Sequence, residues 1–178
     1  MSGRLVMVAG ASGVGKDTLL AFAAARLRHR DDIVFIRRVI TRPADATEAH
    51  EPVDEAAFCA RSRAGGFALE WQAHGMFYGI PRAIEADIAA GKQVIANVSR
   101  GVIGAARAKF PCFVVEITAG ATLRAARLVQ RGREESENIA ARLQRGGAEF
   151  QPDAVIVNDG AIAAAGARLL ALIDSRDS

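Results

Sequence analysis

The 178-residue sequence has few cysteines, little net charge and no long apolar run, and each shortage argues against a class of protein. The two cysteines, Cys59 and Cys112, lack the spacing of a metal site, and no disulfide is expected, which suits a reducing cytoplasm. The formal net charge of +3 is too small to indicate nucleic-acid binding. No stretch is long and apolar enough to span a membrane. We therefore expect a cytoplasmic protein with neither nucleic acid nor membrane as a partner.

A glycine-rich turn joins a short apolar strand to a helix near the start of the sequence. Residues 5–9 are typical of a buried parallel strand, and a cleavable signal peptide is not expected there. In this context the backbone N–H groups of the turn, the positive end of the helix and a lysine ammonium bind nucleotide phosphates. The predicted phosphate-binding loop (P-loop) comprises Gly10, Ala11, Ser12, Gly13, Val14, Gly15 and Lys16.

The residue after Lys16 departs from the usual P-loop pattern. Serine or threonine is expected there, because its hydroxyl binds Mg²⁺. This sequence has Asp17, with Thr18 one place later. Because a carboxylate is a good Mg²⁺ ligand, one interpretation is that Asp17 or Thr18 holds the metal. The alternative is that Asp17 only caps the start of the helix, and the sequence leaves both open.

Short apolar runs alternate with helical patterns along the sequence, which indicates an α/β fold with a parallel sheet covered on both faces. The five runs are residues 5–9, 33–36, 93–97, 112–117 and 154–158. Together with the P-loop they predict a single domain, residues 1–178, with the three-layer fold of P-loop NTPases.

A small acceptor-binding insertion is predicted over about residues 38–80. Residues 43–55 have the composition of an exposed loop, in which His50 has no evident role, and Asp54 is placed to cap a short helix. Residues 67–80 read as a hairpin with glycine at its tip. Pro81 is expected to open a helix that a glycine at position 91 ends.

Two arginine clusters are candidates for phosphate binding. Arg38 and Arg42 flank Thr41 after the second predicted strand, at the sheet end where open α/β folds bind ligands, and they predict an acceptor phosphate site. A second cluster, a predicted lid over about residues 131–142, lies around a break between helices. Such arginines can neutralise a transferring phosphoryl group, a single one being worth ~10³–10⁵ in rate. The alternative is an exposed, arginine-rich helix junction. The cluster comprises Arg131, Arg133 and Arg142.

These segments, in this order, resemble the guanylate kinase family over nearly the whole chain. The matching segments are GASGVGK (10–16), ITRP (40–43), FALEW (67–71), HGMFYG (74–79), RLVQRGREESENIAARL (127–143) and VIVNDG (155–160). The resemblance implies that ATP binds the P-loop, that the second arginine cluster forms the lid, and that Asn158 lies beside the adenine. It also implies that Arg42 and Tyr78 hold the acceptor phosphate and that Glu70 retains a guanine-contacting position.

Other guanine-reading positions of that family differ in this sequence. A second arginine is replaced by Asp45, a serine by Arg38, a strand-end aspartate by Asn97, and a serine after the YG pair by Ile80. A pocket without these groups should not select strongly for guanine. The pattern is similar to the ribose 1,5-bisphosphate phosphokinases of phosphonate catabolism, guanylate kinase relatives with GKD in the loop, an arginine before ITR and an N-x-SR segment, here ending at Arg100.

This second resemblance implies transfer of the ATP γ-phosphate, with Mg²⁺, to the 1-phosphate of ribose 1,5-bisphosphate, which gives 5-phosphoribosyl 1-diphosphate. The expected acceptor contacts are Arg38, Arg42, Glu70, Tyr78, Asn97 and Arg100. The loss of the strand-end aspartate and the gain of Asp17 are expected to be linked. Two alternatives stay open: a guanylate-type nucleoside monophosphate kinase, and a guanylate kinase-like binding module without catalysis.

Overall fold

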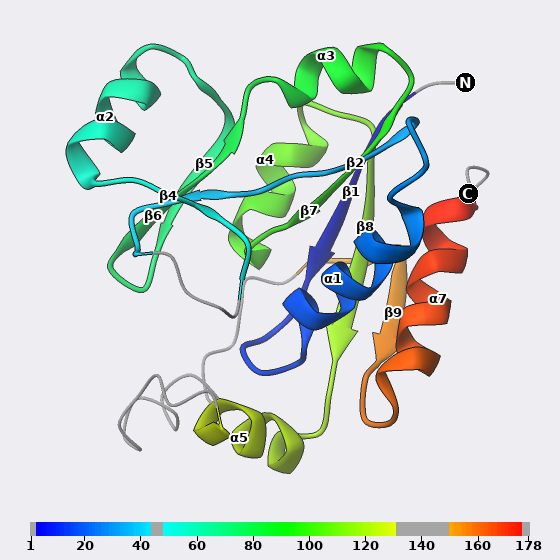
Figure 1. Cartoon of the computed structure of the whole chain (residues 1–178). Helices are drawn as coiled ribbons and strands as arrows, with labels where there is room; N and C mark the ends of the chain where they lie inside the picture. Colours follow the sequence, from blue (N-terminus) through cyan, green and yellow to red (C-terminus); the bar gives the residue numbers. More distant parts are fainter. Residues whose placement is uncertain (1–2, 44–47, 131–149, 176–178) are drawn as a thin grey trace.

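The computed structural model describes residues 3–43, 48–130 and 150–175, the side chains of residues 128–130 excepted (Figure 1). Each of the five predicted apolar runs forms a strand of one parallel sheet, in the order β2-β7-β1-β8-β9. The strands are β1 (Arg4–Ala9), β2 (Ile33–Phe35), β7 (Gln93–Asn97), β8 (Cys112–Thr118) and β9 (Ala154–Val157). The predicted α/β class and core sheet are therefore confirmed.

Helices cover both faces of this core sheet (Figure 1). Along β1, Leu5 and Met7 face a cluster that includes α3 and α4, whereas Val6 and Val8 face α1 and α7, and all four are fully buried. Because both faces are apolar, the strand is a continuous apolar run with no polar alternation. The helices are α1 (Lys16–Leu27), α3 (Ile84–Ala89), the 3₁₀ turn η1 (Arg100–Val102), α4 (Ile103–Arg107) and α7 (Ile162–Asp174).

The predicted insertion forms a second, four-stranded sheet beside the core sheet, with α2 packed on it (Figure 1). The predicted hairpin is present, and an aromatic cluster attaches the helix to it: the Phe58 ring stacks on Phe67 at 4.6 Å and on Phe77 at 5.5 Å between centroids. Asp54 caps the helix as predicted, since Oδ1 accepts from the Ala57 N–H at 2.7 Å. The elements are β3 (Val39–Ile40), β4 (Glu51–Pro52), α2 (Glu55–Arg63), β5 (Phe67–Ala73) and β6 (Met76–Pro81).

The helix after the hairpin starts later than predicted. Pro81 ends β6, where it pairs with Phe67, and α3 begins only at Ile84. The chain stays extended because the N–H of Arg82 donates to the Gly66 carbonyl at 2.9 Å, which continues the strand pairing one residue further. The helical stop is as predicted: Gly91 has φ +82° and its N–H donates to the Ile88 carbonyl.

Helix α5 (Ala121–Gln130) lies at the end of the core sheet where the strands β1 and β8 terminate (Figure 1). The predicted lid arginines, Arg131, Arg133 and Arg142, follow it and lie outside the described residues. Within the ranges that the structure describes, every helix is too short or too polar to cross a membrane.

Candidate active site

The predicted P-loop connects β1 to α1, and two of its glycines have backbone geometry that excludes other residues. Gly10 has φ +148°, and a Cβ there would overlap the carbonyl oxygen of Ile117. Gly15 has φ +91°, and a Cβ there would lie 2.6 Å from Nδ2 of Asn158. The glycines therefore serve both the curvature of the loop and its close packing on neighbouring strands.

Lys16 is folded back over this loop. Its Nζ donates to the carbonyl oxygens of Gly10 at 2.8 Å and Ala11 at 3.0 Å. Burial lowers the pKa of the Lys16 ammonium to about 8; the charge of Asp17 opposes this shift, and those of Arg38 and Arg100 add to it. The ammonium form therefore predominates at neutral pH, held by acceptors that a phosphate oxygen can replace.

Three side chains from the C-terminal half of the chain donate hydrogen bonds to backbone carbonyls of the P-loop. Arg124 Nε donates to the Ser12 carbonyl at 3.1 Å, and Arg127 donates to Val14 at 3.2 Å and to the Asn158 carbonyl at 3.0 Å. Asn158 is 2% exposed, and its Nδ2 donates to the Val14 carbonyl at 2.8 Å. The sequence reasoning missed Arg124 and Arg127, although their i, i+3 spacing on one helix places them on the same face.

The contacts of Asn158 make its predicted place beside the adenine testable. If Asn158 acts by holding the loop, Asn158→Ala should raise the KM for ATP and for GTP by a similar factor, about 5–20-fold, because one buried hydrogen bond is lost. If it reads the adenine edge, the ratio of the two kcat/KM values should change instead. Initial rates with each triphosphate decide between the two roles.

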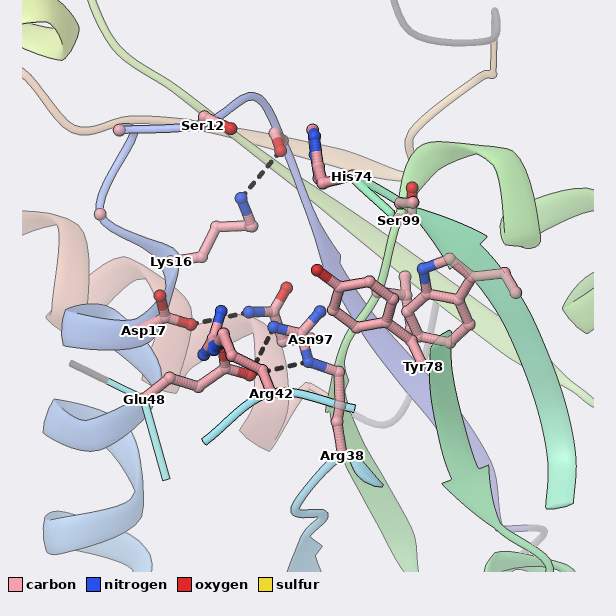
Figure 2. A pocket seen from close by; sticks show the side chains of 16 residues that line it. Ser12, Lys16, Asp17, Arg38, Arg42, Glu48, His74, Tyr78, Asn97 and Ser99 are labelled. Atoms are coloured by element: carbon pink, nitrogen blue, oxygen red, sulfur yellow. Dashed lines mark hydrogen bonds and ion pairs between the residues drawn. The ribbon is translucent and has the colours of Figure 1, made fainter. Parts of the chain in front are cut away.

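Asp17 and Asn97 meet at the mouth of the P-loop. Asn97 ends β7, and its Nδ2 donates to Asp17 Oδ1 at 2.7 Å (Figure 2). The N-cap position of α1 is occupied by Gly15 with no side-chain cap hydrogen bond, so the capping interpretation of Asp17 is wrong. Thr18 is exposed on α1 and does not line the cleft described below. The side chains at positions 17 and 97, which are expected to be linked, are therefore in direct contact.

On the acceptor side, a carboxylate that the sequence reasoning missed joins the two predicted arginines. Arg38 donates through Nε to Glu48 Oε1 at 2.8 Å and through an Nη to the same oxygen, while Arg42 Nη2 donates to Oε2 at 3.1 Å. The side chain of Glu48 is 11% exposed. Burial alone would raise its pKa, but the charges and hydrogen bonds of Arg38 and then Arg42 hold the pKa below its usual value.

Glu48→Gln is expected to lower the free energy of unfolding by about 2–3 kcal/mol, because two partly buried guanidinium groups lose their shared counter-charge. Inorganic phosphate should stabilise this variant more than the wild type, since the anion replaces the missing charge. Urea unfolding with and without phosphate measures both effects. The matched control is Glu51→Gln, because Glu51 pairs with Arg61 at 2.9 Å on the exposed surface.

The pH dependence of this contribution follows from the direction of the shift. Since the pKa of Glu48 is lower in the folded chain, its stabilisation is complete above the ordinary value of 4.5 and is lost as pH falls through the lowered folded pKa. The difference in stability between wild type and Glu48→Gln should therefore shrink below pH 4.5. A difference that is constant down to pH 3 would contradict the ion-pair assignment.

The segment around Glu48 is not the simple exposed loop that its composition predicts. His50 is 7% exposed; its Nε2 lies 3.1 Å from the Arg42 carbonyl oxygen and its Nδ1 lies 3.1 Å from that of Glu48. These backbone contacts draw the segment inward, and β4 then pairs with β3. His50 therefore fixes the backbone that carries Arg42 and Glu48.

Tyr78 and Trp71 form the wall opposite the P-loop. Their rings stack with 5.4 Å between centroids and 5° between planes, and Arg38 lies over the Tyr78 ring at 5.3 Å. Trp71 was predicted to be a core residue, and it does pack against the core, but it also lines the cleft described below. His74 and Ser99 line the same cleft.

Most of the predicted site residues surround one cleft of about 160 Å³, here called the central cleft (Figure 2). Those that line it are Gly10, Ser12, Gly13, Gly15, Lys16, Asp17, Arg38, Arg42, Tyr78 and Asn97, and Glu48 joins them. Among the described residues no group of three or more His, Cys, Asp or Glu side chains is arranged to hold a metal alone. The cleft is therefore lined by P-loop groups on one side and by acceptor-side cations on the other.

Glu70 and Arg100 lie outside the lining of the central cleft. Glu70 is exposed on β5, where its Oε1 accepts from Ser62 Oγ at 3.0 Å, and it lines a separate hollow with Phe58 and Phe77. Arg100 donates to Glu116 at 3.3 Å. The structure thus brings Arg38, Arg42, Tyr78 and Asn97 together but does not place Glu70 with them.

The P-loop between β1 and α1, the parallel core sheet and the cation-lined cleft define the class of this protein as a P-loop kinase. Its fold is that of guanylate kinase: the crystal structure of guanylate kinase from Anaplasma phagocytophilum matches 97% of this chain and 85% of that chain, with a TM-score of 0.67 at 20% identity. The protein-family models give no match.

Curated relatives define the family more closely. The chain is 52% identical to ribose 1,5-bisphosphate phosphokinase PhnN of Acidiphilium cryptum over 172 residues, which cover 97% of this chain and 93% of the relative. It is 46% identical to the protein of that name from Methylobacterium radiotolerans, with 96% and 97% covered, and 45% identical to that from Pseudofrankia inefficax, with 96% and 90% covered. The chain belongs to the ribose 1,5-bisphosphate phosphokinase family.

Proposed function

We propose that this chain transfers the γ-phosphate of ATP to the 1-phosphate of ribose 1,5-bisphosphate, releasing ADP and 5-phosphoribosyl 1-diphosphate. The relatives that define its family carry the name of this activity. The observation that supports it most directly is the placement of Arg38 and Arg42, 12% and 19% exposed, across the central cleft from the P-loop. A doubly phosphorylated sugar without a base requires cations of this kind and needs no purine-reading group.

The cleft suits a mechanism of alignment and charge neutralisation. An ionised oxygen of the acceptor 1-phosphate attacks the γ-phosphorus, and the bond from that phosphorus to the β,γ-bridging oxygen breaks, so that ADP leaves with the electron pair. No general base is required, because the attacking oxygen carries no proton at neutral pH. Lys16 exchanges its two carbonyl acceptors for phosphate oxygens of ATP, and Arg42 and Tyr78 hold the acceptor phosphate.

Closure of the lid is the part of the mechanism that depends on residues outside the described ranges. Arg131, Arg133 and Arg142 are proposed to fold over the transferring phosphoryl group and neutralise the charge on its equatorial oxygens. Exclusion of water by the closed lid would also prevent simple hydrolysis of ATP.

Asp17 fits a role in holding Mg²⁺ with the nucleotide. Carboxylate oxygens are preferred Mg²⁺ ligands, and Mg²⁺ is commonly held by one or two carboxylates together with substrate phosphates and waters. Asp17 lines the central cleft next to Lys16, and Asn97 fixes the position of its Oδ1. When bound, the ion would neutralise charge on the β- and γ-phosphates; Thr18, which is exposed, is the second candidate ligand.

Paired assays test the proposed function. Purified protein is supplied with ATP plus ribose 1,5-bisphosphate and, separately, with ATP plus GMP, and ADP release is measured. The sugar bisphosphate should support the higher kcat/KM. A rate with GMP at least as large would favour the nucleoside monophosphate kinase, and the absence of both ATP binding and turnover would favour a non-catalytic binding module.

A further inference from the structure

Asn97 lies at the end of β7 on the floor of the central cleft, and its contact with Asp17 fixes the orientation of its amide. A carboxylate oxygen only accepts hydrogen bonds, so the NH₂ half of the amide must face Asp17. The oxygen, Oδ1, is therefore turned away from Asp17. Figure 2 shows it directed toward the space between Lys16 and the Tyr78 ring.

This oxygen has no hydrogen-bond partner among the described residues. Asn97 is 7% exposed, and Oδ1 is shielded from solvent. An unsatisfied buried acceptor costs roughly 1–3 kcal/mol, and native proteins leave such groups mainly where a ligand or ordered water completes them. Because Asn97 lines the central cleft, a bound ligand can supply the missing donor.

The ligand groups expected in this cleft differ in whether they can donate. Phosphate oxygens that are ionised at neutral pH accept hydrogen bonds and would repel an amide oxygen. The hydroxyl groups of a sugar donate as well as accept, so they are the matching chemistry. Asn97 also touches Asp17, which directly follows Lys16, so its oxygen lies at the end of the cleft where phosphate transfer occurs.

We propose that Asn97 Oδ1 accepts a hydrogen bond from the C2 hydroxyl of the acceptor ribose, and that this contact selects a ribosyl over a deoxyribosyl substrate. The inference rests on the proposed function. The C2 hydroxyl is borne by the carbon next to the one that carries the reacting phosphate, and it is therefore the hydroxyl nearest to the transfer. The side-chain amide of Asn97 then contacts Asp17 through its NH₂ group and the sugar through its oxygen.

The first test uses the wild-type protein with three acceptors: ribose 1,5-bisphosphate, its 2-deoxy analogue and its 2-deoxy-2-fluoro analogue. Fluorine occupies the place of the hydroxyl but cannot donate. Both analogues are expected to lose about 10–100-fold in kcat/KM, because Oδ1 stays unsatisfied with either. A fluoro analogue that performs as well as the ribose compound would overturn the proposal.

The second test assigns the discrimination to Asn97. In the wild type, kcat/KM for ribose 1,5-bisphosphate is expected to exceed kcat/KM for the 2-deoxy analogue. In Asn97→Leu the ratio of these two values should fall to within about threefold of one. Gln72→Leu, the same amide-to-leucine change at an exposed position of β5 outside the central cleft, should keep the wild-type ratio. Loss of the support that Asn97 gives to Asp17 lowers both rates alike, so the ratio isolates the role of Oδ1. If Asn97→Leu kept the wild-type ratio, the assignment of the discrimination to Asn97 would be refuted.

These outcomes are distinct from a failure of the proposed function. If the wild type turns over GMP at least as fast as ribose 1,5-bisphosphate, the proposed function fails. If it turns over ribose 1,5-bisphosphate faster but accepts the 2-deoxy analogue equally well, only the role of Asn97 fails.

Discussion

Lys16→Met is expected to lower kcat by about 10³-fold or more, because the variant loses the cation that compensates charge on the transferred phosphate. Methionine has a similar length and no charge. In the variant the carbonyls of Gly10 and Ala11 lose the Lys16 Nζ as their hydrogen-bond donor. Because both carbonyls belong to the P-loop, only the loop should loosen. Steady-state rates with saturating ATP and ribose 1,5-bisphosphate measure the effect, and circular dichroism checks the fold.

The matched control for this variant is Lys109→Met. Lys109 Nζ also donates to a backbone carbonyl, that of Ala68 at 3.1 Å, but it lies away from the central cleft. The control should keep kcat within about twofold of the wild type. If Lys16→Met lowered kcat by less than tenfold, the P-loop lysine would not carry the charge compensation proposed for it.

Asn97→Asp is expected to be the second severe substitution. It replaces the donor at 2.7 Å from Asp17 Oδ1 by a second carboxylate oxygen. Two carboxylates whose charge centres lie about 4 Å apart repel each other by about 4 kcal/mol at an effective dielectric constant near 20. We expect kcat/KM to fall about 10²-fold and the urea midpoint to fall with it.

Exchanging the two residues separates the structural from the chemical effect. The double variant Asp17→Asn/Asn97→Asp again pairs one amide with one carboxylate, so its free energy of unfolding should return to near the wild-type value. Its kcat should stay low, because the carboxylate now lies at the end of β7 and no longer on the first turn of α1. Recovery of full activity by the exchange would show that either position can hold the metal-side charge.

Much of the fold and part of the candidate site could be predicted, because their signals are local in the sequence. The P-loop is a contiguous motif, and the five strands are continuous apolar runs, since each lies in a sheet buried on both faces. Arg38 and Arg42 were predicted because they follow a strand at the ligand-binding edge. Pro81 was misassigned because strand pairing by Arg82 outweighed the preference of proline for the first turn of a helix.

The rest of the site depends on contacts between segments that are far apart in sequence. Glu48 follows Arg38 by ten residues, and nothing in that polar stretch reveals that its carboxylate folds between two arginines. Similarly, the resemblance places Asn158 beside the adenine, but it does not reveal that the Nδ2 of Asn158 donates to the carbonyl of Val14, 144 positions earlier. A polar composition predicts that such stretches are exposed. Only the tertiary structure shows the charged partners that bury them.

The bridge that Glu48 makes between Arg38 and Arg42 has a consequence for selectivity among anions. Two guanidinium groups and one carboxylate leave a net charge of +1, where two bare arginines would carry +2, so every incoming anion gains less here. A dianionic phosphate still gains about twice as much as chloride or acetate. The cell's abundant monoanions should therefore compete poorly here, and acceptor affinity should fall less steeply with ionic strength than it would for two bare arginines.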